Sequence, residues 1–191
     1  MLLLLQGSDL SSDKHAHRRN EDSRVSLLAD VVNPAKEVSL EKNPNAMLAV
    51  LWAGFACGVL DITAALVVYG YLGAKPTRLL QGIASGLLGP KAFDGGLATA
   101  LLGLLCHFVI AFGAATVYFV ASRAIPFLIQ NAVLSGVLYG VAVYFFMNRI
   151  VLPLSAAAKR PFSMKLMIVG VVIHIFCVGL PISLSMRRFS R

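Results

Sequence analysis

Four long apolar stretches dominate this sequence, and they leave the chain few ways to fold. Each is more than 20 residues long, poor in charge, and bounded by charged residues, proline or glycine. A helix needs about 20 mostly apolar residues to cross a lipid bilayer. The stretches run over residues 47–72, 97–122, 127–152 and 165–186. The sequence therefore predicts an all-α fold, an integral membrane bundle of four transmembrane helices.

The composition agrees with lipid as the surrounding solvent. Hydrophobic residues make up 58% of the chain and charged residues 14%, whereas soluble domains average about 45–50% and about 25%. The net charge of +8 comes from basic residues that flank the spans. Anionic lipid headgroups are the simplest partner for such residues, so we expect contact with the bilayer surface and no binding of nucleic acid.

Residues 1–45 form a polar stretch that precedes the four-span domain of residues 46–188. This stretch holds seven of the nine acidic residues, and we expect it to be a disordered tail. Because Met47 opens the first span, residues 1–46 are either a genuine tail or the result of a start-site error. A charged tail without a signal peptide is hard to export, so both termini are expected in the cytoplasm. The Lys and Arg residues on the two sides are too evenly divided to decide the orientation.

A short helix is predicted between the first two spans. Pro76 near its start and Gly89-Pro90 at its end bracket residues 77–88. About 12 residues are too few to cross a bilayer. The segment is therefore an interfacial helix in the headgroup plane or a re-entrant half-helix, and the interfacial alternative is favoured.

Three ionisable residues lie near the middle of spans, where such groups are costly and often functional. They are Asp61, His107 and His174, and an alternating topology puts them at similar depths. Small residues flank each of them, which lets helices approach closely and favours a shared polar cluster inside the bundle. The glycines assigned to helix packing are Gly54, Gly58, Gly103, Gly136, Gly140 and Gly170. The Gly54/Gly58 and Gly136/Gly140 pairs are also candidate interfaces in a homo-oligomer.

Three roles are open for this cluster. In the favoured one, Asp61 accepts hydrogen bonds from both imidazoles and fixes the packing, in a protein with a structural or membrane-homeostasis role. In the second, the cluster binds protons or ions in a small transporter or channel that acts as an oligomer. In the third, His107 and His174, with Cys177 as a further ligand, bind haem or a transition metal.

Other polar residues near the span ends are candidates for contact with a substrate or with lipid. These are Gln81, Ser85, Asn148 and Arg149. No nucleotide-binding, hydrolase or zinc-protease motif is present, so the sequence predicts neither an enzyme nor a resident cofactor. The three cysteines lie in apolar runs without a C-x-x-C pair, which is typical of small buried side chains.

Four short runs resemble a family of small four-span bacterial inner-membrane proteins. They are residues 80–89 (LQGIASGLLG), 107–112 (HFVIAF), 147–155 (MNRIVLPLS) and 178–182 (VGLPI). The layout is also loosely similar to YagU-type inner-membrane proteins, which share a histidine in the second span and a basic tail. The resemblance covers about residues 50–188. It implies a bacterial inner-membrane location and a four-span fold, and it implies no activity, substrate or cofactor.

Overall fold

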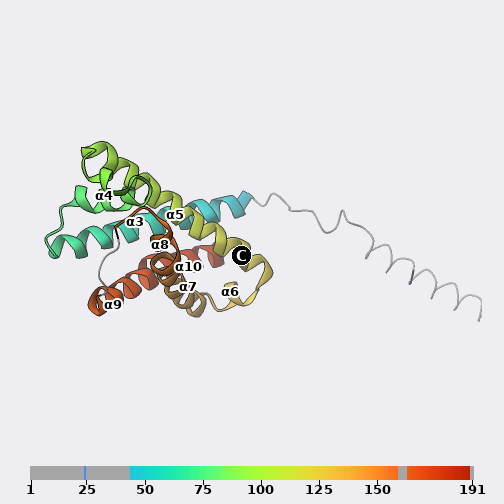
Figure 1. Ribbon diagram of the computed structural model, residues 1–191. Coiled ribbons are helices and arrows are strands. Elements are labelled where there is room, and N and C mark those ends of the chain that lie inside the picture. Colours follow the sequence, from blue (N-terminus) through green and yellow to red (C-terminus); the bar gives the residue numbers. More distant parts are fainter. Residues whose placement is uncertain (1–23, 25–43, 159–162, 190–191) are drawn as a thin grey trace, which may run out of the picture. The chain divides into compact units, whose positions relative to one another are not determined.

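The computed structural model describes residues 24, 44–158 and 163–189. Of the predicted N-terminal tail of residues 1–45, the structure describes only Arg24, Pro44 and Asn45, and the last two belong to the first long helix. From Pro44 onward the described chain is helical and contains no strand (Figure 1). This confirms the predicted all-α class.

Four helices are long and apolar enough to cross a membrane, and each overlaps one of the four predicted spans. The first two are single α-helices, α3 (Pro44–Tyr71) and α5 (Gly96–Ala124). The third and fourth are each built from three consecutive segments. The third comprises α7 (Ala132–Phe146), η2 (Met147–Val151) and α8 (Leu152–Leu154). The fourth comprises α9 (Met164–Ile173), η3 (His174–Gly179) and α10 (Leu180–Phe189).

The middle segments η2 and η3 are π-helical, and a single residue separates the end of each segment from a proline. Pro153 follows Leu152 after η2, and Pro181 follows Leu180 after η3. Proline has no N–H to donate to the carbonyl four residues earlier. In membrane helices, local π-turns can satisfy the backbone groups that a proline frees, and π-turns are frequent at functional sites. Here η3 begins at His174, one of the predicted site residues.

Glycines set the closest helix contacts in the bundle. Gly54 and Gly58 of α3 lie against the rings of Phe112 and Phe108 of α5. Gly136 and Gly140 of α7 lie against backbone atoms of the fourth span, including the Gly179 and His174 carbonyls. Both predicted glycine pairs are therefore covered by helices of the same chain. An oligomer would have to use other faces of the bundle.

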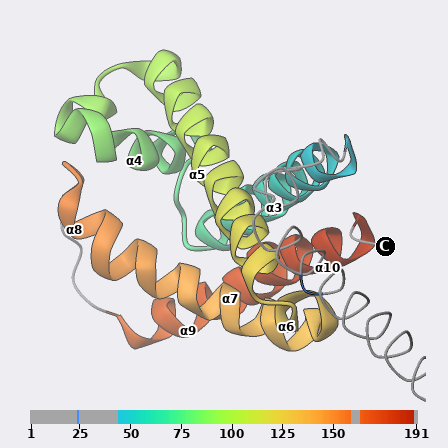
Figure 2. The same ribbon diagram turned by 90° about the vertical axis from the view of Figure 1, so that its right-hand side faces the viewer.

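The short helix α4 (Pro76–Leu88) lies beside α5 and is followed by the 3-10 helix η1 (Gly89–Phe93) (Figure 2). Gly103 of α5 makes this contact possible, since its Cα faces backbone atoms of Leu80 and Ala84. The backbone N–H of Ala156, which follows the third span, donates to the Gly86 carbonyl at 2.9 Å. The helix α4 thus joins the N-terminal half of α5 to the connection between the last two spans.

The third span begins later than the sequence predicts. Residues 127–130 form a separate turn, α6 (Phe127–Gln130), and the helix axis breaks at Asn131, whose φ is −109° and ψ is 51°. Asparagine tolerates such a turn conformation well. Leu128 and Ile129 consequently fold onto the core instead of extending α7.

The side chains buried between the helices are mostly small, while large apolar side chains face outward. The core contains Ala49, Ala53, Cys57, Ala111, Ala115, Tyr118, Val178, Ile182 and Met186. Leu101, Leu105 and Val109 are about 60% exposed along α5 (57%, 61% and 63%). In water such exposure would be costly, so the outer surface suits a lipid environment.

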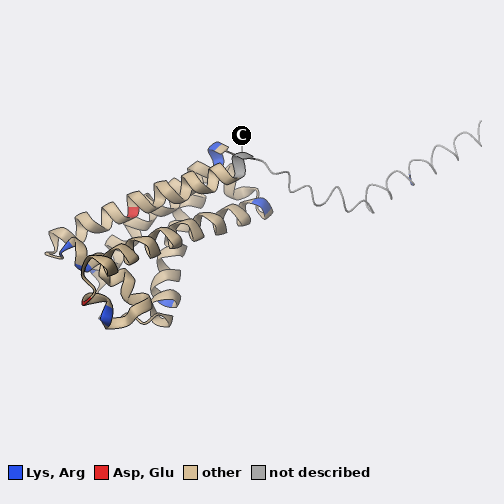
Figure 3. Ribbon diagram, turned by 90° about the horizontal axis from the view of Figure 1, so that it is seen from above, with Lys and Arg blue, Asp and Glu red and all other residues tan. Residues whose placement is uncertain are grey.

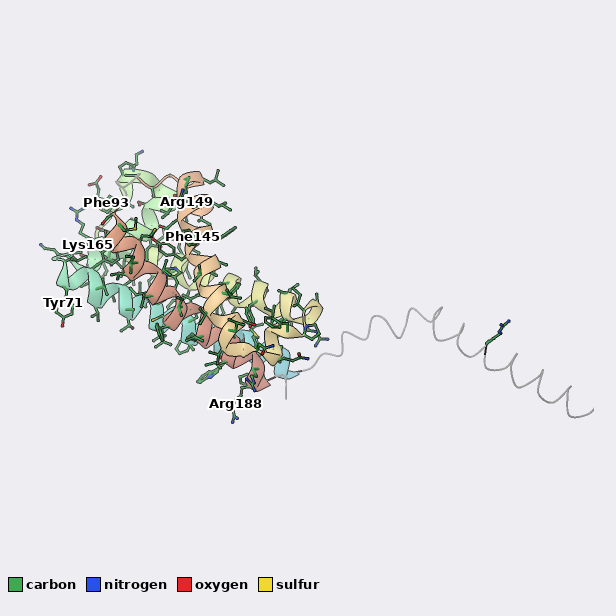
Figure 4. The ribbon with its side chains drawn as sticks, turned by 90° about the horizontal axis from the view of Figure 1, so that it is seen from below. Tyr71, Phe93, Phe145, Arg149, Lys165 and Arg188 are labelled. Carbon is green, nitrogen blue, oxygen red and sulfur yellow. The ribbon has the colours of Figure 1, made fainter. Side chains whose placement is uncertain are left out.

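The charged residues gather at the two ends of the bundle (Figure 3). Arg149 and Lys165 lie with Tyr71 and Phe93 at one end, and Arg188 lies at the other (Figure 4). The end that holds Arg149 is called the α4 end below, and the end that holds Arg188 is called the α6 end. Asp61 is an exception to this distribution, because it lies within α3.

Candidate functional site

Asp61 lies in the interior of the first span, far from both ends. It is 14 residues from Met47 and 10 from Tyr71, the limits of that span, or roughly 21 Å and 15 Å along the helix. The side chain is partly buried. Among the described residues, its buried Oδ1 atom has no hydrogen-bond partner. A carboxyl oxygen in that position is costly unless a proton, a cation or a donor occupies it.

Two cysteines lie on the helix segments next to this carboxyl group. Cys57, one turn earlier on α3, is 2% exposed, and Cys177 belongs to η3, which packs against α3. Both are close enough to Asp61 for electrostatic interaction, and Cys57 is also within that range of Cys177. Among the described residues, the neighbours of Asp61 identified in this way are thiols, which are weak hydrogen-bond donors.

His107 approaches α3 near Asp61 but does not bind its carboxyl group. The Nε2 atom of His107 lies 2.9 Å from the Gly58 carbonyl oxygen, three residues before Asp61. As a donor, this nitrogen joins α5 to α3. The contact agrees with the similar depth expected for the two residues, but its acceptor is a backbone oxygen.

His174 faces a different helix. Its Nδ1 atom lies 2.9 Å from the Gly170 carbonyl oxygen of its own span. Its ring packs edge-on against Tyr144 of α7, with 5.3 Å between the ring centroids. The predicted three-residue cluster is thus divided, because His107 contacts α3 while His174 contacts α7. Neither histidine has a hydrogen bond to Asp61 in the described structure.

The four residues proposed for substrate or lipid contact separate into a buried pair and an outer pair. Gln81 and Ser85 are each 4% exposed on the inner face of α4. Gln81 donates to the Gly96 carbonyl at 2.9 Å and Ser85 to the Gly82 carbonyl at 2.7 Å. Asn148 donates to the Tyr144 carbonyl at 2.9 Å, whereas Arg149 is exposed at the α4 end. The contacts of Gln81 and Ser85 stabilise the fold, and Arg149 is accessible to a headgroup.

A metal centre at the predicted residues has no support from their positions. Within residues 44–158 and 163–189, no three His, Cys, Asp or Glu side chains are grouped so that they could hold an ion. His107 and His174 each have one ring nitrogen at a backbone carbonyl.

Sequence reasoning missed a set of buried hydroxyl groups toward the α6 end. Tyr118 is 1% exposed and donates to the Leu128 carbonyl at 2.9 Å, and Tyr139 donates to the Ala114 carbonyl at 2.7 Å. Their rings pack edge-to-face with centroids 4.9 Å apart. Ser135 and Ser183 are also buried, at 2% and 0% exposure. The four-residue spacing of Ser135 and Tyr139 was the available signal, since it places both on one face of a helix.

Comparisons with known proteins add no functional assignment. No protein-family model, no curated protein and no solved structure matches the chain.

Proposed function

We propose that this chain is a multi-pass membrane protein with an intramembrane proton-binding site at Asp61, which serves proton-linked transport. The observation that carries the proposal is the buried Oδ1 atom of Asp61, which lacks a hydrogen-bond partner within the described residues. Intramembrane carboxyl groups are uncommon because they are costly, and those that occur frequently mark proton or ion pathways. Proton uptake would remove the negative charge that makes a carboxylate costly at this depth, and it needs no further ligand.

A purely structural role for Asp61 is less consistent with these contacts. A structural role would require the imidazoles of His107 and His174 both to donate to the Asp61 carboxyl group. Those two hydrogen bonds would fix the register of three helices. Instead, His107 is placed at the Gly58 carbonyl and His174 at the Gly170 carbonyl. A residue retained for packing alone gains little from an unpaired oxygen, because burial without a partner costs about 1–3 kcal/mol.

A proton fits the surroundings better than a metal cation or haem. Hard cations such as Na⁺ or Ca²⁺ prefer several oxygen ligands, whereas the identified neighbours of Asp61 are the thiols of Cys57 and Cys177. A bis-histidine haem needs two imidazoles facing one another across the ring. Here His107 contacts α3 and His174 contacts Tyr144.

The α4 end supports placement at an anionic membrane surface. Lys75 and Arg78 at the start of α4 and Lys91 just after it are exposed. Because both ends of α4 carry exposed basic residues, an interfacial position in the headgroup plane fits better than a re-entrant one. Together with Arg149, these side chains would contact lipid phosphates.

The proposed location and assembly rest on the resemblance and on the number and packing of the spans. An inner membrane of a bacterium, with both termini in the cytoplasm, agrees with the resemblance and with an even number of spans. Four helices enclose little space, so transport would be carried out by a homo-oligomer. The outer face of α7 is the proposed contact between copies, because the third span is the least buried of the four within the chain.

Proton flux into liposomes tests the proposal. Purified protein is reconstituted with an internal pH-sensitive dye, and a potassium diffusion potential drives proton entry. The wild type should acidify the lumen, and Asp61→Asn should remove most of this flux. Asp94→Asn is the matched control, since Asp94 is an exposed acid after η1 and should leave the flux unchanged. Equal flux in wild type and Asp61→Asn would overturn the proposal.

A further inference from the structure

An open apolar groove lies on the outer surface of the bundle and runs inward from the α6 end. Its volume is about 350 Å³, within the range of about 300–1,000 Å³ that is common for small-molecule sites. Three helices, α3, α5 and α10, supply its lining residues, which are Leu48, Leu51, Trp52, Phe55, Phe112 and Phe189. Asp61 is not one of these residues, so an occupant of the groove would add a function to the proposed one.

One face of α3 forms the long wall of this groove. Four lining residues follow the spacing i, i+3, i+4 and i+7, which places side chains on one face of a helix. They are Leu48, Leu51, Trp52 and Phe55, and they are 52%, 49%, 60% and 53% exposed. The wall extends roughly 10 Å along the helix axis, whereas one leaflet of hydrocarbon is about 15 Å deep. The groove can therefore hold the upper part of one acyl chain.

Aromatic rings close the inner end of the groove. The ring of Phe112 on α5 lies directly against Gly54 of α3, where any side chain would collide with it. Phe108 lies between the other two rings, with its centroid 6.5 Å from that of Phe112 and 6.3 Å from that of Phe55. Because these rings support one another and rest on a glycine, the shape of the groove is built into the contact between α3 and α5.

The charges at the mouth of the groove are basic. Arg188 directly precedes the lining residue Phe189 and is exposed at the α6 end (Figure 4). Arg123, in the last turn of α5, adds a second exposed cation at this end. The acidic residues of the described chain are Asp61, within α3, and Asp94, after η1. A positive rim beside an apolar groove complements a molecule that joins an anionic headgroup to an acyl chain.

Trp52 places the groove near the membrane surface. It follows Met47, the limit of the first span, by five residues, or roughly 8 Å along the helix. Tryptophan is enriched at the boundary between headgroups and hydrocarbon, because its ring is apolar and its N–H is a hydrogen-bond donor. At that level the ring meets the upper part of an acyl chain, and the N–H can donate to a lipid ester carbonyl.

We propose that the groove binds one phospholipid with an anionic headgroup, whose acyl chain lies along Leu51 and Phe55 and whose phosphate contacts Arg188. Hydrogen bonds between guanidinium and phosphate groups are short and strong, since both groups are charged. This lipid is held at its charged part and at its apolar part, so it should be preferred over the surrounding lipids. The site does not depend on the proton-binding role of Asp61.

A second copy of the chain is a less suitable occupant. In a two-fold contact the same surface of both copies meets. Contact through this groove would therefore bring Arg188 of the two copies near each other, and like charges oppose such an approach. A phospholipid brings the opposite charge to the same position.

The fluorescence of Trp52 tests the site directly, because the chain contains a single tryptophan. The full chain is reconstituted in phosphatidylcholine vesicles with an increasing fraction of phosphatidylglycerol brominated on its acyl chains, since bromine quenches a neighbouring indole. In the wild type, quenching should saturate at a low fraction of phosphatidylglycerol. In the reverse mixture, unbrominated phosphatidylglycerol should protect Trp52 from quenching by brominated phosphatidylcholine.

Two matched pairs of substitutions locate the lipid. Arg188→Gln should raise the phosphatidylglycerol fraction at half-maximal quenching about fivefold, as expected for one basic residue near an anionic group. Arg123→Gln removes the same charge from the same end and should leave this fraction unchanged. Leu51→Phe adds a ring to the groove wall and should weaken saturable quenching. Leu105→Phe should not, because Leu105 is 61% exposed on α5 outside the groove.

Three results would overturn the proposal. Equal quenching by the two brominated lipids at every fraction would show only ordinary contact with the bilayer. Equal weakening in Arg188→Gln and Arg123→Gln would show a general attraction to the charged end. Quenching by neither lipid would show that a second copy or another part of the chain covers the groove. Circular dichroism checks that each variant is folded, and the comparison of the two lipids in the wild type needs no variant.

Discussion

Replacing Gly140 with alanine tests the close packing of α7 against the fourth span. A β-carbon at Gly140 would lie 2.5 Å from the His174 carbonyl oxygen and 2.7 Å from the Ile175 Cα. Ordinary contact begins at 3.4 Å, so the shortfall is about 0.9 Å. Both obstructing atoms belong to backbone, which cannot rotate away as a side chain can. The two helices would have to separate.

The expected cost follows from two opposing effects. Overpacking of this kind costs about 1–3 kcal/mol, whereas alanine favours a helix over glycine by about 0.5–1 kcal/mol. We therefore expect Gly140→Ala to lower the free energy of unfolding by about 1–2 kcal/mol. The assay is titration with a denaturing detergent, followed by circular dichroism of protein in mild micelles.

Gly113→Ala is the matched control for this substitution. Gly113 also lies within a membrane-length helix, but a β-carbon there would meet nothing within 4 Å. The variant should be as stable as the wild type or slightly more stable. If the two variants have the same stability, the contact between α7 and η3 is not as close as described.

Two further substitutions test contacts of the predicted site residues. Gln81→Leu should remove the hydrogen bond to the Gly96 carbonyl and weaken the α4–α5 contact by about 1 kcal/mol. Amide hydrogen exchange should then be faster across residues 76–88. Gln130→Leu is the control, since Gln130 is exposed. Unchanged protection of residues 76–88 in Gln81→Leu would contradict the contact. His107→Leu should lower stability by about 0.6 kcal/mol, the average for a hydrogen bond in a membrane, and should leave proton flux intact. Loss of flux in a stable His107→Leu protein would show that this histidine takes part in proton transfer.

The limits of the four spans, except the start of the third, were predictable because hydropathy is a local property of the sequence. A stretch of about twenty apolar residues that ends at a charged residue such as Arg187, or at a proline such as Pro153, can be recognised without knowing which helices pack against it. The short helix α4 was predictable for a related reason, since proline and glycine mark its ends. The turn α6 was not, because Phe127 to Gln130 is as apolar as the span it precedes, and only the Asn131 conformation separates them.

The partners of the site residues were harder to predict. A soluble helix shows its inner face by its apolar stripe, but a membrane helix is apolar on all sides. Sequence spacing therefore placed His107 and His174 near the depth of Asp61 without fixing how each helix is rotated about its axis. In the structure His107 binds a backbone carbonyl, and His174 turns toward Tyr144. The π-helical turns of η3 add a further rotation that residue counting at the α-helical period does not include.

The proposed role of Asp61 is to bind and release a proton inside the membrane. Infrared difference spectra of the reconstituted protein, recorded between acidic and alkaline buffer, test it directly. We expect a carboxyl band that changes with pH in the wild type and in Asp94→Asn, and that is missing in Asp61→Asn. A wild-type difference spectrum identical to that of a folded Asp61→Asn protein would contradict the claim.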